Sequence, residues 1–276
     1  MAGGFRVREQ KFICGKDYAT AETMQVDFFE ITEQQHKAST RKKKELASSI
    51  AKEAYNLRQS GRYLELLIQR NFRRTDYSVT YTYDNDRLPA PGDMERVDKD
   101  FSAAMKKLYR MCDKAGIEHP GWIDVAEYMT YVDGRWIGRH HHHIVMQHTK
   151  GLTREMIEKA WGDRGMARCE PLHFDHGYVV GLSKYIMKNV RCKRHWRQSR
   201  GLKPPKMPSP NDGKMSRGKL KDVCENRLED RAFWEKMYPG YTLHYCEPII
   251  TGNSTRHLIV RLYRKETGMK NRRNQP

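Results

Sequence analysis

Apolar and polar residues alternate from residue 77 to 83, where Val79, Tyr81 and Tyr83 point to one side and small polar residues to the other. A period of two is typical of a strand with one buried face. Between residues 97 and 108 the apolar positions recur three and four apart, which is the spacing of a helix. The pattern therefore predicts a strand followed by a helix that covers one face of its sheet.

Two further strands, at 123–131 and 137–147, are joined across Asp133-Gly134, a strong hairpin signal. After them the pattern predicts, in order, a helix at 153–161 capped by Thr153, a strand at 167–172 and a helix at 178–190. This order of elements indicates an α+β fold, with a central antiparallel sheet and helices packed on it.

Helical spacing also precedes this central part of the chain. After a basic run at 41–44, apolar residues three and four apart at 46–57 and again at 63–67 predict two helices, broken near Ser60-Gly61. We therefore expect residues 1–75 to form a basic N-terminal helical region.

The composition shifts after the central part. Prolines and polar residues at 203–213 are typical of a linker, and helical spacing at 220–234 is followed by a hairpin around 251–254 and a basic tail. We expect residues 191–276 to form a basic C-terminal α/β extension, which leaves 76–190 as the central domain.

Charge divides the chain in the same way. The formal net charge is +18, yet Lys and Arg exceed Asp and Glu by 6 in residues 1–75 and by 13 in 191–276, whereas the balance in 76–190 is −1. This distribution suits an enzyme whose centre collects carboxylates and whose surroundings hold a polyanion such as nucleic acid. The alternative is a basic protein with solvated faces.

The cysteines and the hydropathy of the chain indicate its cellular location. The six cysteines lie far apart, without a C-x-x-C pair, and we expect no signal peptide. No stretch approaches the ~18 apolar residues that span a bilayer. We expect reduced thiols, a cytoplasmic location and no membrane contact.

Four consecutive histidines, residues 140–143, carry the first candidate chemistry. Side chains alternate along a strand, so either His140 with His142 or His141 with His143 can share a face. A hairpin centred on Gly134 would place Glu127 opposite His141, and would bring Glu127, His141 and His143 to one inward surface as ligands for a divalent cation.

In this interpretation His140 and His142 point outward as bystanders, and a register slip of one residue would reverse the choice. The alternatives are a polar surface run and a structural zinc site, although no cysteine is placed to complete the latter. We interpret His173 and His176 as loop residues.

Tyr185 is the candidate nucleophile. On the expected helix, Tyr185 and Lys188 lie three apart and hence side by side, on the flank of an apolar stripe. A tyrosyl oxygen beside an ammonium group can attack a phosphodiester if a metal polarises the phosphate. A tyrosine on an amphipathic helix more often forms the edge of a core, so the assignment depends on the histidine strand upstream.

The order of these motifs resembles the HUH endonuclease superfamily, and within it the replication initiators of plasmids, phages and integrated elements in Gram-positive bacteria. The likeness is carried by the first strand motif at 79–84, the histidine motif at 138–145, the tyrosine motif at 182–188 and the basic segment at 196–202, with weaker likeness at 12–15 and 71–72. This sequence departs from the common pattern in having histidine at all four positions of the metal motif, and Gly201 where an asparagine is common.

The resemblance implies that residues 76–190 form a nicking domain of the HUH type. His141 and His143, completed by Glu127, would bind Mg²⁺ or Mn²⁺. Tyr185 would form a 5′-phosphotyrosine and release a 3′-OH primer for rolling-circle replication, while Lys188 steadies the phosphate. The DNA contacts that we expect are Arg139, Lys184, Arg194, Trp196, Arg197, Arg200 and Lys203.

The implied partners are single-stranded or hairpin origin DNA together with a host helicase and polymerase, because the chain lacks a phosphate-binding loop of its own. The nearest other tyrosine, Tyr178, lies seven residues before Tyr185, which indicates a one-tyrosine enzyme. Two alternatives remain: a relaxase or single-strand transposase with the same chemistry, and a non-catalytic basic DNA-binding protein whose histidines are structural.

Overall fold

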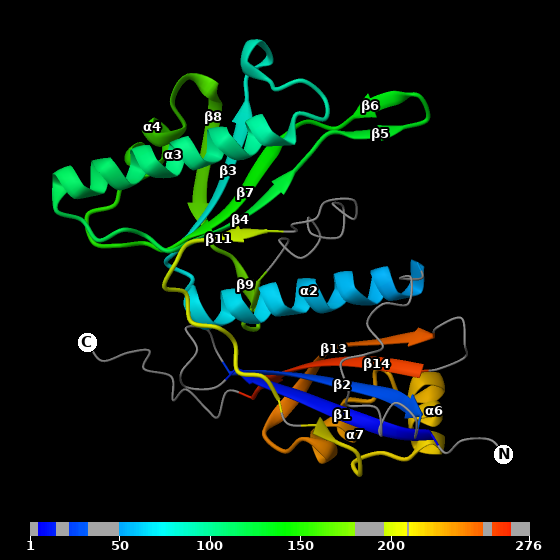
Figure 1. Ribbon diagram of the computed structural model, residues 1–276. Coiled ribbons are helices and arrows are strands. Elements are labelled where there is room, and N and C mark those ends of the chain that lie inside the picture. The colour runs from blue at the N-terminus through cyan, green and yellow to red at the C-terminus, as the bar shows by residue number, and fades with distance from the viewer. Residues whose placement is uncertain are drawn as a thin grey trace, which may run out of the picture. The chain divides into compact units, whose positions relative to one another are not determined.

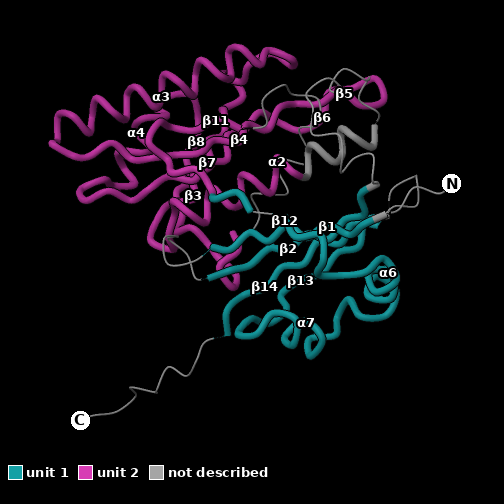
Figure 2. The backbone as a smooth tube through the Cα atoms, turned by 60° about the horizontal axis from the view of Figure 1, so that its bottom comes forward, with its two compact units in different colours: residues 1–55, 206–276 teal, residues 56–205 magenta. Residues whose placement is uncertain are grey.

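The computed structural model describes residues 5–14, 22–32, 50–179, 196–208, 210–250 and 256–265 (Figure 1). The chain divides into two compact units (Figure 2). The central unit comprises residues 56–205, and the terminal unit comprises residues 1–55 together with 206–276. Both units contain antiparallel sheets with helices, so the expected α+β class is confirmed.

The central unit is built on a five-stranded antiparallel sheet with the strand order β11-β4-β7-β3-β8. Its strands are β3 (Tyr77–Tyr83), β4 (Trp122–Glu127), β7 (His141–Met146), β8 (Gly165–Pro171) and β11 (Arg197–Gln198). Its helices are α3 (Met94–Ala115), α4 (Arg154–Trp161) and most of α2 (Ile50–Asn71). Short strand pairs lie outside this sheet: β5 (Thr130–Val132) with β6 (Arg135–Ile137), and β9 (Phe174–Asp175) with β10 (Tyr178–Val179).

Helices pack on both faces of this sheet, and on one of them they cover only part of the face. On one face α3 and α4 pack on Tyr81 and Tyr83 of β3, and the ring of Trp161 stacks on Tyr81 with 4.7 Å between centroids. On the other face the apolar side of α2 packs on Val125 and Val145. β4 and β7 therefore supply side chains to both cores. The alternation predicted at 77–83 and the helices predicted at 97–108 and 153–161 are confirmed.

The local signals in the central unit act as expected. Asp133 and Gly134 have φ values of 49° and 80°, the two positive angles of a tight hairpin turn between β5 and β6. The Thr153 side chain accepts a hydrogen bond from the Met156 amide and so caps α4.

The terminal unit joins the two ends of the chain in one antiparallel sheet, with the order β12-β1-β2-β14-β13. The strands are β1 (Phe5–Cys14), β2 (Thr23–Thr32), β12 (Pro210–Asn211), β13 (Tyr241–Ile250) and β14 (Arg256–Arg264). Two helices, α6 (Arg217–Asn226) and α7 (Arg231–Met237), bury Leu220, Val223 and Trp234 against the apolar face of this sheet.

The N-terminal region corrects the expectation of a helical segment. Residues 5–32 contain two long strands, because Met24, Val26 and Phe28 alternate with polar residues and face the core. Further along, α2 runs without a break through Ser60-Gly61, and the helix expected at 220–234 is two helices. The unit boundaries also differ from the three expected regions, since residues from both ends share one sheet.

The helix expected at 178–190 begins with a short strand instead, because Tyr178 and Val179 pair with β9; the remaining residues of that prediction lie outside the described ranges. The five described cysteines form no disulfide with one another. No helix within the described ranges combines the length and apolar character needed to cross a membrane.

The continuity of α2 gives a stability test. Apart from its chain neighbours and the backbone of its own helix, a methyl group added at Gly61 would have no atom within 4 Å. Alanine is also favoured over glycine inside a helix. Gly61→Ala should therefore raise the free energy of unfolding by about 0.5–1 kcal/mol in urea titrations followed by circular dichroism.

Gly165→Ala serves as the contrasting variant. Gly165 has a φ of 151°, and an added methyl would collide with the Thr82 carbonyl oxygen, so this change should destabilise the protein strongly. A loss of stability in Gly61→Ala would indicate that the helix ends at the glycine, as the sequence pattern had suggested.

Candidate functional site

The pairing of β4 with β7 sets which histidines share a face. Glu127 lies opposite His141 and Val125 lies opposite His143, as predicted. The tip of the hairpin is offset by one residue from this register, since Tyr131 pairs with Trp136. Two residues separate β4 from β5 whereas three separate β6 from β7, and this extra residue produces the observed register.

Glu127, His141 and His143 therefore lie on one face of the sheet. Glu127 Oε2 and His143 Nε2 are 3.2 Å apart, and the rings of His141 and His143 are roughly parallel with centroids 6.1 Å apart. The side chains of His143 and Glu127 are 12% and 23% exposed, so the pair is accessible from solvent.

The orientation of the His141 imidazole suits metal ligation. The Nδ1–H of His141 donates to the Arg139 carbonyl oxygen at 2.7 Å, which leaves Nε2 with its lone pair. Burial lowers the pKa of His143, and the neighbouring Glu127 carboxylate only partly offsets this. A lowered pKa favours the neutral imidazole, which is the form that binds a metal.

The three side chains are not a closed ligand set as they stand. Over the ranges that the structure describes, no three His, Cys, Asp or Glu side chains gather closely enough to hold a metal ion. Their residue types and their shared face nevertheless fit a divalent cation that keeps open positions for substrate oxygens.

The other two histidines are buried on the opposite face, which corrects the expectation that they point outward. His140 and His142 are both 0% exposed. His140 Nδ1 accepts a hydrogen bond from the Met129 amide, and the ring of His142 stacks on Phe101 of α3. These side chains face inward because α3 and α4 bury this face of the sheet.

A fully buried carboxylate, Asp124, joins three strands behind the histidines. Burial alone would raise the pKa of Asp124, but His142 and Arg197 outweigh it and hold that pKa below its usual value. An ionised carboxylate only accepts hydrogen bonds, so His142 Nδ1–H donates to it, at 3.1 Å. The Arg197 guanidinium of β11 donates to the same carboxylate at 2.6 and 3.1 Å.

Arg197 therefore does not fit the DNA contact predicted for it. Besides its two bonds to Asp124, its third nitrogen donates to the Asp98 carbonyl oxygen at 3.1 Å. The sequence contained a signal for this network, since a charged residue inside an apolar strand such as β4 requires a buried partner. The sequence pattern does not indicate which basic residue pairs with Asp124.

The other described residues that were predicted to contact DNA divide into two kinds. Arg139 donates to the Tyr83 carbonyl oxygen and to Asn85, and the ring of Trp196 stacks on Tyr63 of α2, so both act within the fold. The side chains of Arg200 and Lys203 are exposed.

The predicted nucleophile lies outside the described residues. Tyr185 and Lys188 fall within 180–195, as do the DNA contacts predicted at Lys184 and Arg194. Their roles stay predictions from the sequence. His173 and His176 are exposed in a loop and a turn, as expected.

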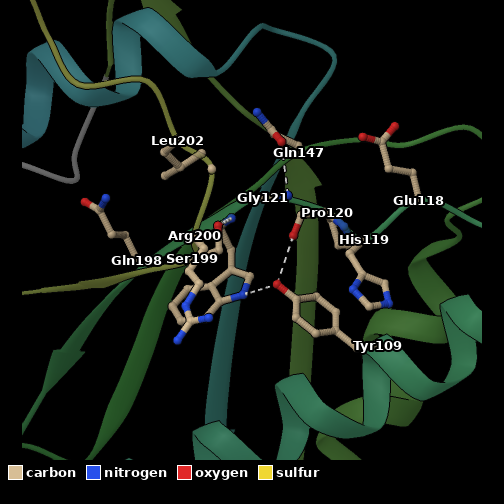
Figure 3. Close-up of a pocket in the computed structure, with 12 residues that line it drawn as sticks. Tyr109, Glu118, His119, Pro120, Gly121, Gln147, Gln198, Ser199, Arg200 and Leu202 are labelled. Carbon is tan, nitrogen blue, oxygen red and sulfur yellow. Dashed lines mark hydrogen bonds between the residues drawn. The ribbon is translucent and has the colours of Figure 1, made fainter.

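A pocket of about 540 Å³, lined in part by His119, lies where β4 begins, away from His141 and His143 (Figure 3). The Tyr109 hydroxyl accepts from the Trp122 ring nitrogen and donates to the Pro120 carbonyl oxygen, and Arg200 lines the rim. Glu127 stands at the opposite end of the same strand, so the pocket and the histidine face are separate features.

Two carboxylates in β4 allow a matched test of these roles. Asp124→Asn would remove the fully buried carboxylate that Arg197 pairs with and leave it only the half-exposed Asp98, at 3.2 Å, and should lower the free energy of unfolding by about 3 kcal/mol. Glu127→Gln changes a carboxylate on the accessible face and should alter stability by less than ~0.5 kcal/mol. Chemical unfolding of both variants measures the difference, and equal effects would contradict the assigned roles.

Comparisons with known proteins do not extend this description. No family model, no curated protein and no solved structure matches the chain. The interpretation of the site therefore depends on its own residues: a carboxylate and two imidazoles on an accessible sheet face, with a buried Asp124 network behind them.

Proposed function

We propose that this protein is a metal-dependent endonuclease that nicks single-stranded DNA at a replication origin, in the manner of rolling-circle initiators. One observation carries the proposal: Glu127, His141 and His143 share one accessible face of a central antiparallel strand pair. A tyrosine followed three residues later by a lysine lies downstream in the sequence, as this chemistry requires.

His141, His143 and Glu127 would hold Mg²⁺ or Mn²⁺ through imidazole nitrogens and a carboxylate oxygen. Bound there, the cation would polarise the scissile phosphodiester and stabilise its developing charge. The carbonyl oxygen of Arg139 holds the His141 ring in the required tautomer.

Tyr185 is the proposed nucleophile. Its phenolic oxygen attacks phosphorus, a new P–O bond forms to the tyrosine, and the bond from phosphorus to the 3′ oxygen breaks. The tyrosine loses its proton and the leaving 3′ oxygen gains one, which yields a 5′-phosphotyrosine and a free 3′-OH. Because tyrosine has an ordinary pKa near 10, it needs help in losing this proton, and Lys188 would stabilise the charge.

The surroundings of the histidine face agree with a nucleic-acid substrate. Thr80 and Thr82 lie opposite His143 and His141 on β3, and Arg168 of β8 lies beside Thr80 on the same face. The Arg168 side chain is 69% exposed although it pairs with Glu170. With a net charge of +18, the chain would attract a polyanion to this face. A cytoplasmic setting, with a host helicase and polymerase, belongs to the same proposal.

The proposal is tested by cleavage of single-stranded origin DNA in the presence of Mn²⁺. Tyr185→Phe and His143→Ala should each reduce the nicking rate by at least ~100-fold, because one removes the nucleophile and the other a metal ligand. Tyr185→Phe should also abolish the covalent protein–DNA adduct seen in denaturing gels.

Two variants serve as controls. Tyr178→Phe changes the nearest other tyrosine, and His173→Ala changes an exposed loop histidine. Both should cleave at the wild-type rate. Cleavage that survives Tyr185→Phe would remove the nucleophile assignment, and binding of DNA without cleavage by the wild type would favour a non-catalytic DNA-binding protein.

A further inference from the structure

A two-stranded hairpin, β5 with β6, projects beyond the ends of β4 and β7 (Figure 1). Every residue of the two strands is exposed. Four of them are large and apolar, with exposed fractions between 40% and 52%: Tyr131, Val132, Trp136 and Ile137. Exposed apolar side chains gathered on a small projection indicate a binding element.

The two aromatic residues share one face of the hairpin. Tyr131 and Trp136 are directly paired across the strands, and their ring centroids are 5.3 Å apart. The neighbouring apolar residues, Val132 and Ile137, belong to the other face because side chains alternate. One edge of the Trp136 ring lies over Gly92 in the loop before α3, which helps to fix its orientation.

The hairpin is continuous with the strands that carry the candidate ligands. Tyr131 follows Glu127 by four residues, and Trp136 precedes His141 by five. At ~3.3 Å per strand residue, the rings can lie up to about 13–17 Å along the chain from these ligands. That length corresponds to about four or five stacked nucleotides at ~3.4 Å each.

We propose that Tyr131 and Trp136 form a stacking platform for unpaired nucleobases of single-stranded DNA, up to about four or five nucleotides from the scissile phosphate. The inference rests on the proposed nicking function and adds how the substrate strand is held. Two ring faces are far smaller than the ~800 Å² per partner of a stable protein interface. A nucleobase needs only one ring on which to stack.

Binding of fluorescently labelled oligothymidylate, measured by anisotropy in EDTA, tests the platform without any cleavage. Tyr131→Ala with Trp136→Ala should weaken binding roughly tenfold or more, because stacking on an aromatic side chain contributes on that scale per base. Tyr131→Phe with Trp136→Phe should bind about as well as the wild type. Val132→Ala with Ile137→Ala, which removes apolar groups from the other hairpin face, should also leave the affinity unchanged.

Folding is not expected to interfere, since the hairpin belongs to none of the buried cores and thermal unfolding of all three double variants should match the wild type. Unchanged oligothymidylate affinity in the double alanine variant would overturn the inference. If that variant also lost self-association in sedimentation, the hairpin would instead be assigned to contact with a second copy of the chain. Failure of the nicking proposal would look different: the wild type would not cleave in Mn²⁺, whereas the effect of the aromatic residues on binding would remain.

Discussion

The buried ion pair between Asp124 and Arg197, with His142 as a third partner, is the interaction on which the central unit depends. It joins β4, β7 and β11 through one carboxylate that has no access to solvent. A buried charge that lost these partners would destabilise the sheet strongly. The network therefore stabilises the observed strand register, and this register places His141 and His143, and not their neighbours, on one face with Glu127.

The four histidines consequently divide into two pairs with separate roles. His140 and His142 point into the core under α3, where they bond to the Met129 amide and to Asp124. His141 and His143 remain accessible on the face that bears Glu127. One pair positions the strand and the other is available for chemistry, which explains why a run of identical residues need not be a single metal cluster.

Much of the central unit could be predicted because its signals are local. The alternation in β3, the helical spacing of α3, the Thr153 cap and the Asp133-Gly134 turn each depend on neighbouring residues. The pairing of Glu127 with His141 was predicted from a hairpin centred on Gly134, whereas the structure reaches it through a different tip register and one extra residue before β7.

The predictions that the structure corrects concern residues whose contacts lie far away in the sequence. The alternation in β2 could have been recognised, but its pairing with β14 joins residues more than 200 apart in sequence, which no local pattern specifies. The inward direction of His140 and His142 depends on which helices cover each face of the sheet. The choice of Arg197 as the partner of Asp124 depends on the short strand β11, whose two residues carry no periodicity.

The most direct measurement of the central claim is the electron spin echo spectrum of Mn²⁺ bound to the protein. The register predicts modulation from two imidazole nitrogens in the wild type and from one in each of His141→Gln and His143→Gln. A spectrum without imidazole coupling, or one in which both couplings persist in both variants, would contradict the account.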